Sequence, residues 1–296
     1  MQAHPAAVDG RKMEKLTRGA LQIRNWRHLW GERTLLMGIV NVTPDSFSGD
    51  GILEPEKALA YALEQARLGA DIVDLGAQST RPGHQAIDVE EELRRLIPVL
   101  TLLRHRSDCL VSIDTTEPAV LSAAVAAGAD MLNSIWGLTD NLLEAVKDLQ
   151  IPVVLMHNKH KAEYDGDVVD EVLDALARQA DRAISVGVKA EHIILDPGIG
   201  FGKTAEHNLA LLHSLDRLVK LGFPTLLGTS RKSFIGKLTD KTVDSRAFGT
   251  AASVALAVAA GVDMVRVHDV EAMVDVVKVA DAIVRGCRPV GWNTIS

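Results

Sequence analysis

The sequence has few cysteines and no long hydrophobic run. Its two cysteines, Cys109 and Cys287, lie in no metal-ligand spacing, and one possible pair is too few for a disulfide framework, so we expect free, buried thiols. No stretch of about 18 apolar residues occurs, and no apolar segment of the signal-peptide type lies near the N-terminus. We therefore expect neither membrane insertion nor secretion, and the cytoplasm is the simplest compartment.

Linkers and recurrent basic segments are also lacking. No proline- or serine-rich stretch divides the 296 residues, and the 47% apolar content is enough for one large core. Arginines and lysines gather in residues 1–33 beside Trp26 and Trp30, but no basic and aromatic pattern recurs and the net charge is −7. We therefore do not expect a nucleic acid as partner.

The sequence does contain eight short apolar runs, separated by segments long enough for a helix. The runs are residues 35–40, 72–75, 110–113, 131–132, 153–156, 193–195, 225–227 and 264–267. Strands that alternate with helices form a parallel sheet, and several runs lack the alternation typical of half-exposed strands. This pattern predicts an α/β fold with a single closed (β/α)8 (TIM) barrel over residues 34–290, rather than an open doubly wound sheet. Residues 1–33 would form an N-terminal extension that covers the barrel bottom or meets a partner subunit.

A polar residue follows each of the eight runs. The active site of a (β/α)8 barrel lies at the C-terminal ends of its strands, so these residues are the candidate functional residues. They are Asn41, residues 78–83, Asp114 and Thr115, Asn133 and Ser134, His157 and Asn158, residues 196–203, residues 230–233, and residues 266–269. Each alone could cap a helix. Together, Asp, Lys, Arg and His side chains at one mouth indicate a ligand site.

The residue types at this mouth suit two kinds of ligand group. Five donors predict a locally positive mouth that favours an anionic, phosphorylated substrate. They are Arg81, Arg231, Lys232, Arg266 and His268. Asp114, Asn133 and Asp196 supply carboxylate acceptors and an amide that both donates and accepts, as needed to bind the edge of a flat heterocycle.

Known phosphate-loop and zinc motifs are not met. In residues 196–204, Pro197 stands where the Walker pattern needs glycine, and Lys203 where the dinucleotide pattern needs glycine. We expect the three glycines of this segment to let the backbone approach a ligand and turn into the next helix. The histidines form no HExxH-like cluster, so a protein-bound zinc is not expected. Mg²⁺ held mainly by substrate phosphates fits the sequence.

Seven sequence blocks resemble those of the dihydropteroate synthase family. The blocks are residues 37–48, 79–83, 113–115, 155–157, 195–203, 230–233 and 266–270. Their order is far more specific than any single motif. The resemblance implies a homodimeric (β/α)8-barrel transferase of folate biosynthesis. Such an enzyme condenses 6-hydroxymethyl-7,8-dihydropterin diphosphate with p-aminobenzoate, giving 7,8-dihydropteroate and pyrophosphate, with Mg²⁺ as cofactor.

The same resemblance implies a role for individual residues. The pterin pocket would be lined by Asp114, Asn133, Met156, Asp196, Phe201 and Lys232. The diphosphate would be bound by Asn41, Arg266 and His268, with Asn41 also holding Mg²⁺. The p-aminobenzoate site would be formed by Thr43, Pro44, Phe47, Thr80, Arg81, Pro82, Lys232 and Ser233. The catalytic residues would be Asp114, Asp196, Lys232, Arg266 and His268.

Four positions depart from the family pattern. Ala77 replaces a Gly, Gln78 a Glu, Ser134 an Asp, and Asn158 a common Met. Two alternatives stay open: a folate-dependent methyltransferase-like barrel, which would share the pterin pocket, and a catalytically silent pterin-binding paralogue, which the departures at Gln78 and Ser134 suggest. If the p-aminobenzoate residues act as the resemblance implies, sulfonamides should inhibit the protein.

Overall fold

The fold is a barrel of eight parallel strands surrounded by helices. The computed structural model describes residues 19–43, 55–78, 87–289 and 292. The barrel strands are β3 (Leu35–Asn41), β4 (Ile72–Gly76), β5 (Leu110–Asp114), β6 (Met131–Ser134), β7 (Val153–Met156), β8 (Ile193–Asp196), β9 (Leu226–Leu227) and β10 (Met264–Val267). They pair in the order β8-β7-β6-β5-β4-β3-β10-β9, and a parallel bridge between Leu195 and Thr225 joins β8 to the start of β9. The predicted (β/α)8 barrel is confirmed, and every predicted run overlaps a strand.

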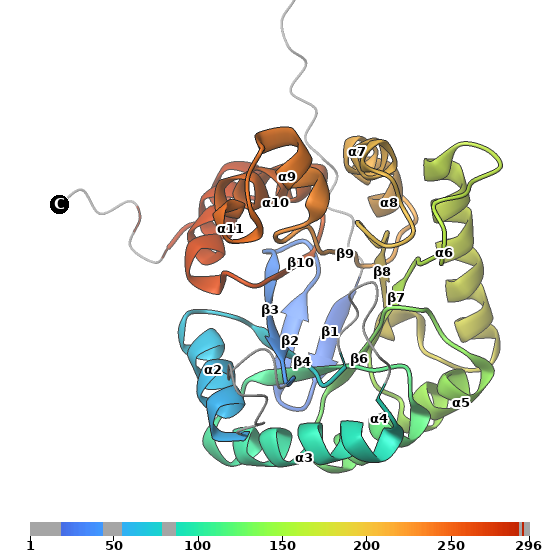
Figure 1. Ribbon diagram of the computed structural model, residues 1–296, viewed down its shortest axis with the longest axis vertical. Helices are drawn as coiled ribbons and strands as arrows, with labels where there is room; N and C mark the ends of the chain where they lie inside the picture. Colours follow the sequence, from blue (N-terminus) through green and yellow to red (C-terminus); the bar gives the residue numbers. More distant parts are fainter. Residues whose placement is uncertain (1–18, 44–54, 79–86, 290–291, 293–296) are drawn as a thin grey trace, which may run out of the picture.

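Helices occupy the segments between the strands and form an outer ring (Figure 1). They are α2 (Pro55–Arg67), α3 (Val89–Arg106), α4 (Pro118–Ala126), α5 (Asp140–Leu149), α6 (Val168–Ser185), α7 (Ala205–His213), α8 (Leu215–Val219), α9 (Ser233–Thr239), α10 (Ala247–Ala260) and α11 (Val270–Val284). The side chains of Asp88, Thr139 and Asp167 accept hydrogen bonds from first-turn amides and so fix where α3, α5 and α6 begin. Among the residues that the structure describes, no helix is long and apolar enough to cross a membrane.

Two different layers of side chains fill the inside of the barrel. Side chains alternate along a strand, so residues two apart face the same side. The lower layer is apolar and every strand contributes to it; its members are Leu35, Met37, Ile72, Leu110, Met131, Val154, Ile194, Leu226 and Met264. Toward the C-terminal ends of five of the strands the inward-facing side chains are polar: these are Asp74, Ser112 and Asp114, Asn133, Asp196 and Arg266. The upper layer is therefore polar and lies toward the C-terminal ends of the strands.

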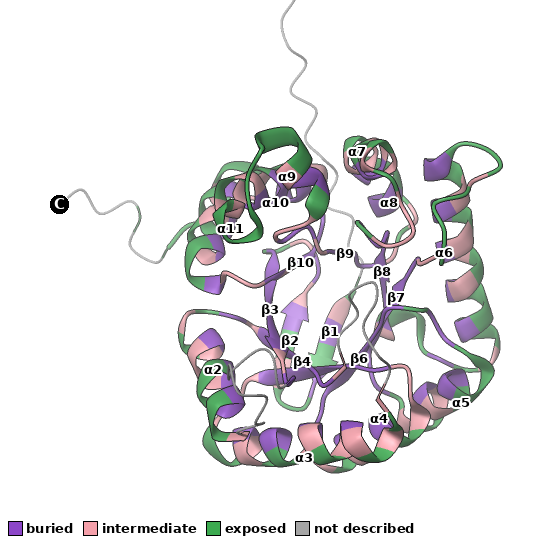
Figure 2. Cartoon of the chain, in the orientation of Figure 1, coloured by how far each residue is buried: buried purple, intermediate pink, exposed green. Residues whose placement is uncertain are grey.

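The outward faces of the strands pack against the helices. Val73, Leu75 and Val111, for example, lie in one buried cluster with the apolar faces of α2 and α3. Figure 2 shows the result: the strands are buried, and the helices are buried toward the sheet and exposed toward solvent. Stability thus comes from two apolar regions, the helix–sheet interface and the lower layer inside the barrel.

A hairpin covers the N-terminal end of the barrel. Its strands, β1 (Ala20–Ile23) and β2 (Trp26–Leu29), pair antiparallel, and Leu21, Ile23 and Trp30 pack into the apolar lower layer. The division of the chain into residues 1–33 and 34–290 stays a prediction, and residues 1–18 lie outside the described part. Cys109 and Cys287 are both half-buried, whereas buried thiols were expected.

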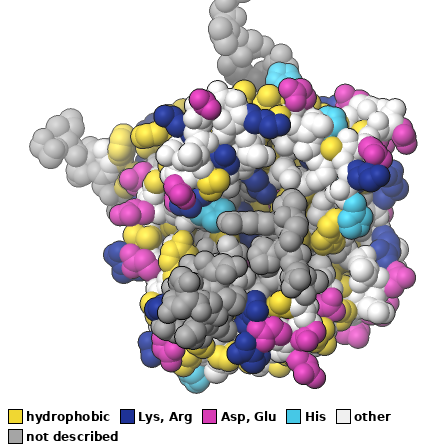
Figure 3. All heavy atoms as spheres, in the orientation of Figure 1, with side chains coloured by type: hydrophobic (Ala, Val, Ile, Leu, Met, Phe, Trp, Pro, Cys, Tyr) yellow, Lys and Arg dark blue, Asp and Glu magenta, His cyan; other side chains and the backbone are white. Residues whose placement is uncertain are grey.

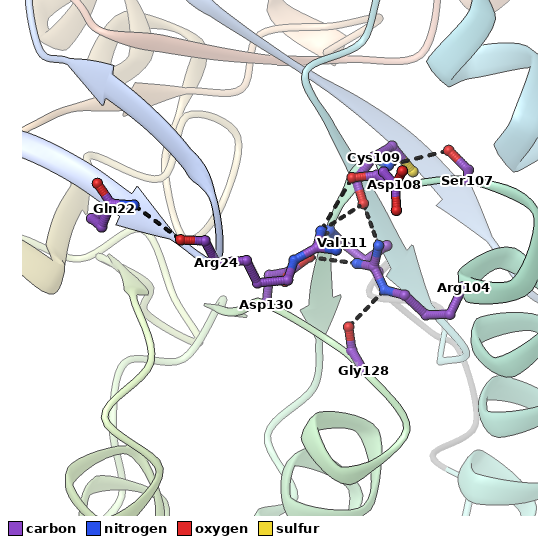
Figure 4. Close-up of polar contacts among 9 residues, drawn as sticks. All are labelled: Gln22, Arg24, Arg104, Ser107, Asp108, Cys109, Val111, Gly128 and Asp130. Atoms are coloured by element: carbon purple, nitrogen blue, oxygen red, sulfur yellow. Dashed lines mark hydrogen bonds and ion pairs between the residues drawn. The ribbon is translucent and has the colours of Figure 1, made fainter.

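An ionic network joins the hairpin to the barrel (Figure 4). At the hairpin turn, Arg24 has a left-handed φ of 52°, and its Nε lies 2.9 Å from Oδ1 of the buried Asp130. Arg104 of α3 binds the same carboxylate, which also accepts a hydrogen bond from the Val111 amide at 2.8 Å. Asp130 therefore connects the hairpin, α3 and β5 at the N-terminal end of the barrel.

Candidate active site

Four side chains of the polar upper layer contact one another across the barrel. Arg266 of β10 donates from Nε to Asp74 of β4 at 2.6 Å and from Nη2 to Asp114 of β5 at 3.1 Å. Asn133 of β6 donates from Nδ2 to the same Asp74 oxygen at 3.1 Å. These four strands are not all neighbours in the sheet, so the contacts are possible only inside the barrel. The alternation of side chains thus brings one arginine, one amide and two carboxylates to a single place.

Burial gives the carboxyl groups of this site unusual proton affinities. It raises the pKa of Asp114 from 3.8 to about 7, against the opposing effect of Arg266. It also raises the pKa of Asp196 to about 6, although Asp196 Oδ1 accepts a hydrogen bond from the Gly198 amide at 2.7 Å. Burial therefore makes both groups harder to ionise than exposed carboxyl groups, a perturbation that is common at functional sites.

Two lysines lie on the β8 and β9 side of the same mouth. Lys232 places Nζ 3.9 Å from the centre of the Phe201 ring, a cation–π contact, and burial lowers its pKa to about 8. Lys203 Nζ lies 3.0 Å from His157 Nδ1 and donates to the Phe201 carbonyl at 2.9 Å. Burial lowers the pKa of Lys203 to about 7. The two lysines hold Phe201 between them, one through its ring and one through its carbonyl.

The glycines after β8 allow close contact with the segment that follows β7. A Cβ on Gly198 would lie 1.9 Å from the His157 carbonyl oxygen, and one on Gly202 would lie 2.2 Å from that of Lys159. Both glycines have left-handed φ angles. The two glycines thus allow a close approach to neighbouring backbone, and the expected approach to a ligand stays a prediction. The following helix, α7, starts at Ala205 with a Thr204 capping box.

The mouth is less positive than the sequence suggested. Arg231 donates from Nε to Asp269 at 3.0 Å, and its Nη1 lies 3.5 Å from Asp244, so nearby carboxylates balance its charge. Burial, with the nearby arginines, lowers the pKa of His268 to about 3, and its Nδ1 lies 3.0 Å from Ser230 Oγ. The prediction that Arg231 and His268 add positive charge is therefore wrong, because one is paired and the other is neutral.

The structure describes most of the predicted site residues. Asn41 is half-buried at the end of β3, Thr43 is buried just beyond it, Met156 is buried at the end of β7, and Ser233 is exposed at the start of α9. Five predicted p-aminobenzoate residues lie outside the described part of the chain: Pro44, Phe47, Thr80, Arg81 and Pro82. Figure 3 shows that the described residues on this face carry charged side chains of both signs.

Ser134, one of the departures from the family pattern, is fully buried and its hydroxyl donates to the Gly137 carbonyl. This contact ties the loop after β6 to itself. The Ser that replaces the family's Asp therefore contacts the loop that follows Asn133. The other departure, Gln78, is half-buried and is the last described residue before the gap at residues 79–86.

Reading only the strand ends missed Asp74. It lies in the middle of β4, inside the otherwise apolar run of residues 72–75, and it is completely buried. The available signal was period two: Asp74 follows the inward-facing Ile72 by two residues, as Asn133 follows Met131. A charged residue inside an apolar strand is thus as informative as one at its end.

The fold and the site define this molecule as a (β/α)8 barrel with a polar ligand site at its C-terminal mouth. The sequence profile of the family described as pterin binding enzyme matches residues 37–268. The dihydropteroate synthase of Synechocystis is 47% identical over 270 residues, which are 86% of this chain and 92% of the relative.

Solved structures agree. The dihydropteroate synthase of Xanthomonas albilineans in complex with 7,8-dihydropteroate superposes with a TM-score of 0.83 at 42% identity, covering 92% of this chain and 100% of the other. The Yersinia pestis dihydropteroate synthase with a sulfonamide drug superposes with a TM-score of 0.84 at 34% identity, covering 91% and 100%. The chain belongs to the pterin binding enzymes and, within them, to the dihydropteroate synthases, transferases of folate biosynthesis.

Proposed function

We propose that this protein condenses 6-hydroxymethyl-7,8-dihydropterin diphosphate with p-aminobenzoate. The bond between the pterin methylene carbon and the diphosphate oxygen breaks, the amine nitrogen bonds to that carbon and loses a proton, and pyrophosphate leaves. The observation that carries the proposal is the polar layer of Asp114, Asn133, Asp196 and Arg266 inside a barrel of this family. It combines a set of acceptors with a cation that suits an anionic leaving group.

The carboxylates fit the pterin half of the substrate. Positive charge grows on the pterin as pyrophosphate leaves, and the buried Asp114 and Asp196 stabilise it electrostatically when ionised. Asn133 and Lys232 complete the polar edge of this pocket, while Met156 and Phe201 supply apolar walls. This assignment makes Asp114, Asp196 and Lys232 catalytic residues.

Arg266, His268 and Asn41 fit the diphosphate half. Arg266 carries the charge, and the neutral imidazole of His268 donates one hydrogen bond. Among the described residues, no group of three or more His, Cys, Asp or Glu side chains could hold a metal ion. Asn41, half-buried at the end of β3, offers an amide oxygen that, with substrate phosphate oxygens and water, would give Mg²⁺ the oxygen ligands it prefers. When bound, Mg²⁺ would neutralise charge on the leaving group.

The p-aminobenzoate site stays a proposal that rests on the sequence blocks. Lys232 and Ser233 lie side by side, Lys232 as N-cap and Ser233 as first residue of α9. Thr43 is buried next to the barrel mouth. The other proposed contacts, Pro44, Phe47, Thr80, Arg81 and Pro82, belong to the segments outside the described residues. A related structure with a sulfonamide supports a site of this kind.

We further propose a homodimer that forms through α10 and α11. These two helices pack against each other, and large apolar side chains remain exposed on them: Phe248 is 91% exposed, Leu256 69% and Ile283 78%. An apolar surface of this kind is typical of a subunit interface. Sedimentation of Phe248→Glu tests it: dissociation to monomers is expected, whereas Leu209→Glu on α7 should leave the wild-type state unchanged.

The enzymatic test combines the protein with pterin diphosphate, p-aminobenzoate and Mg²⁺, and measures pyrophosphate and dihydropteroate together. Equal release of both products is expected, and chelation of Mg²⁺ should reduce it. Binding of the pterin without release would support the silent paralogue and overturn the proposal. A methyltransferase-like barrel would likewise release no pyrophosphate.

A further inference from the structure

Asp74 links two residues that the proposed function assigns to opposite halves of the substrate. One oxygen of its carboxylate, Oδ2, accepts from Arg266 Nε at 2.6 Å and from Asn133 Nδ2 at 3.1 Å. Arg266 is assigned to the diphosphate and Asn133 to the pterin. Asp74 itself is completely buried, in the middle of β4.

Stability alone does not explain a carboxylate at this position. Taking a charge out of water costs several kcal/mol, and well-packed apolar side chains often replace a buried ion pair without loss of stability. The other carboxylate oxygen, Oδ1, is buried and has no hydrogen-bond partner among the described residues. Such an incompletely satisfied buried charge calls for an explanation outside packing.

The geometry around Arg266 supplies that explanation. Because Asp74 holds Nε, the plane of the guanidinium group is fixed, and Nη2 reaches Asp114 at 3.1 Å. The same carboxylate oxygen fixes which way the Asn133 amide points, since only its Nδ2 side can donate to Asp74. Without Asp74, both side chains could adopt other rotamers.

We propose that Asp74 is a positioning residue that holds Asn133 and Arg266 in one arrangement, so that the pterin and diphosphate ends of the substrate are bound in fixed register. This inference rests on the proposed function. It predicts that one buried carboxylate, which lies behind two substrate-binding residues, sets the affinity for both ends of the substrate.

The test measures binding of the two ends separately in Asp74→Asn. Calorimetry with inorganic pyrophosphate reports on Arg266, and calorimetry with a pterin that lacks the diphosphate reports on Asn133. The asparagine amide oxygen can still accept both hydrogen bonds but carries no charge, so we expect both dissociation constants to rise about tenfold, the difference between a charged and a neutral hydrogen bond. The KM for p-aminobenzoate should change less than twofold. Unchanged binding of either ligand would overturn the proposal.

Asp130→Asn is the matched control. Asp130 is also a buried aspartate bound to arginine side chains, but it lies at the bottom of the barrel. If loss of a buried ion pair weakens ligand binding only by destabilising the fold, Asp74→Asn and Asp130→Asn should weaken it to the same extent. That result would contradict the positioning role of Asp74. We expect Asp130→Asn to lower the melting temperature and leave both dissociation constants unchanged.

A double-mutant cycle tests the link without altering Asp74. Asn133→Ala and Arg266→Lys are combined, and binding of pterin diphosphate is measured in all four proteins. Non-additive effects are expected because the two side chains share Asp74, and strictly additive effects would overturn the proposal. If the wild type makes no dihydropteroate, the proposed function fails; if it does and these binding tests fail, only the role of Asp74 is lost.

Discussion

Asp114→Asn should reduce catalysis while removing a source of instability. In the wild type, burial raises the pKa of Asp114 from 3.8 to about 7. One pKa unit corresponds to about 1.4 kcal/mol, so ionising this group in the folded protein costs about 4 kcal/mol more than ionising it in the unfolded chain. Asparagine has the same shape as the neutral acid and never carries this charge.

The sign of the pH dependence follows from the direction of the shift. Between pH 3.8 and about 7 the folded state binds more protons at Asp114 than the unfolded state does, so the free energy of unfolding falls as pH rises. The stabilising contribution of the neutral acid is complete below this range and is lost above it. Asp196, whose pKa is raised to about 6, contributes in the same direction in both proteins.

The measurement is chemical denaturation of the wild type and Asp114→Asn at several pH values from 4 to 8. The difference between the two free energies of unfolding should change by about 4 kcal/mol over this range, in favour of the variant at high pH. Pyrophosphate release by the variant should fall about a hundredfold, the effect of losing one electrostatic contact in a transition state. A difference that does not vary with pH would refute the electrostatic reasoning, and near wild-type turnover would remove Asp114 from catalysis.

Three further predictions concern the lysine, the hairpin and inhibition. Lys203→Met removes the amino group that contacts both the Phe201 carbonyl and His157. Pterin affinity in calorimetry should fall about tenfold, and unchanged affinity would show that Lys203 does not position Phe201. Arg24→Ala leaves Asp130 paired with Arg104, and the Arg24 side chain is itself 43% exposed; denaturation should show a loss of about 1 kcal/mol with kcat unchanged, and a lower kcat would link the barrel bottom to the site. Sulfonamides should inhibit competitively with p-aminobenzoate, and full activity at a large excess over its KM would count against the proposed pocket.

Much of the fold could be predicted because it depends on local patterns. Each β-strand of the barrel is a short apolar run, and the runs are separated by segments of helical length, as at residues 72–75 and 110–113. The seventh strand is shorter than its run, since Thr225 makes only a bridge to β8. The closure of the barrel between β8 and β9 could not be predicted from local strand propensity, because the bridge joins Leu195 to Thr225, a residue in the next strand segment.

The site was predictable in position but not in its internal contacts. Strand ends located Asp114, Asn133 and Asp196 because parallel strands end on one side of a barrel. Pairings such as Arg231 with Asp269 depend on the tertiary structure, and the left-handed φ of 58° at Arg231 has no signal in that residue type. The neutral state of His268 depends on its burial in the folded chain, which composition does not reveal.

The contrast between the two layers inside the barrel explains how this chain tolerates buried charges. The apolar lower layer, covered by the hairpin, packs residues from every strand and contributes stability. The polar layer above it contains Asp114 and Asp196, whose ionised forms are costly in the folded protein because burial raises their pKa values. In the proposed site, a pterin that donates hydrogen bonds to both carboxylates would offset this cost, so substrate binding and ionisation of the two groups would favour each other. Substrate binding should therefore raise the free energy of unfolding by reducing the cost of ionising Asp114 and Asp196, whereas the contribution of the apolar lower layer should stay the same.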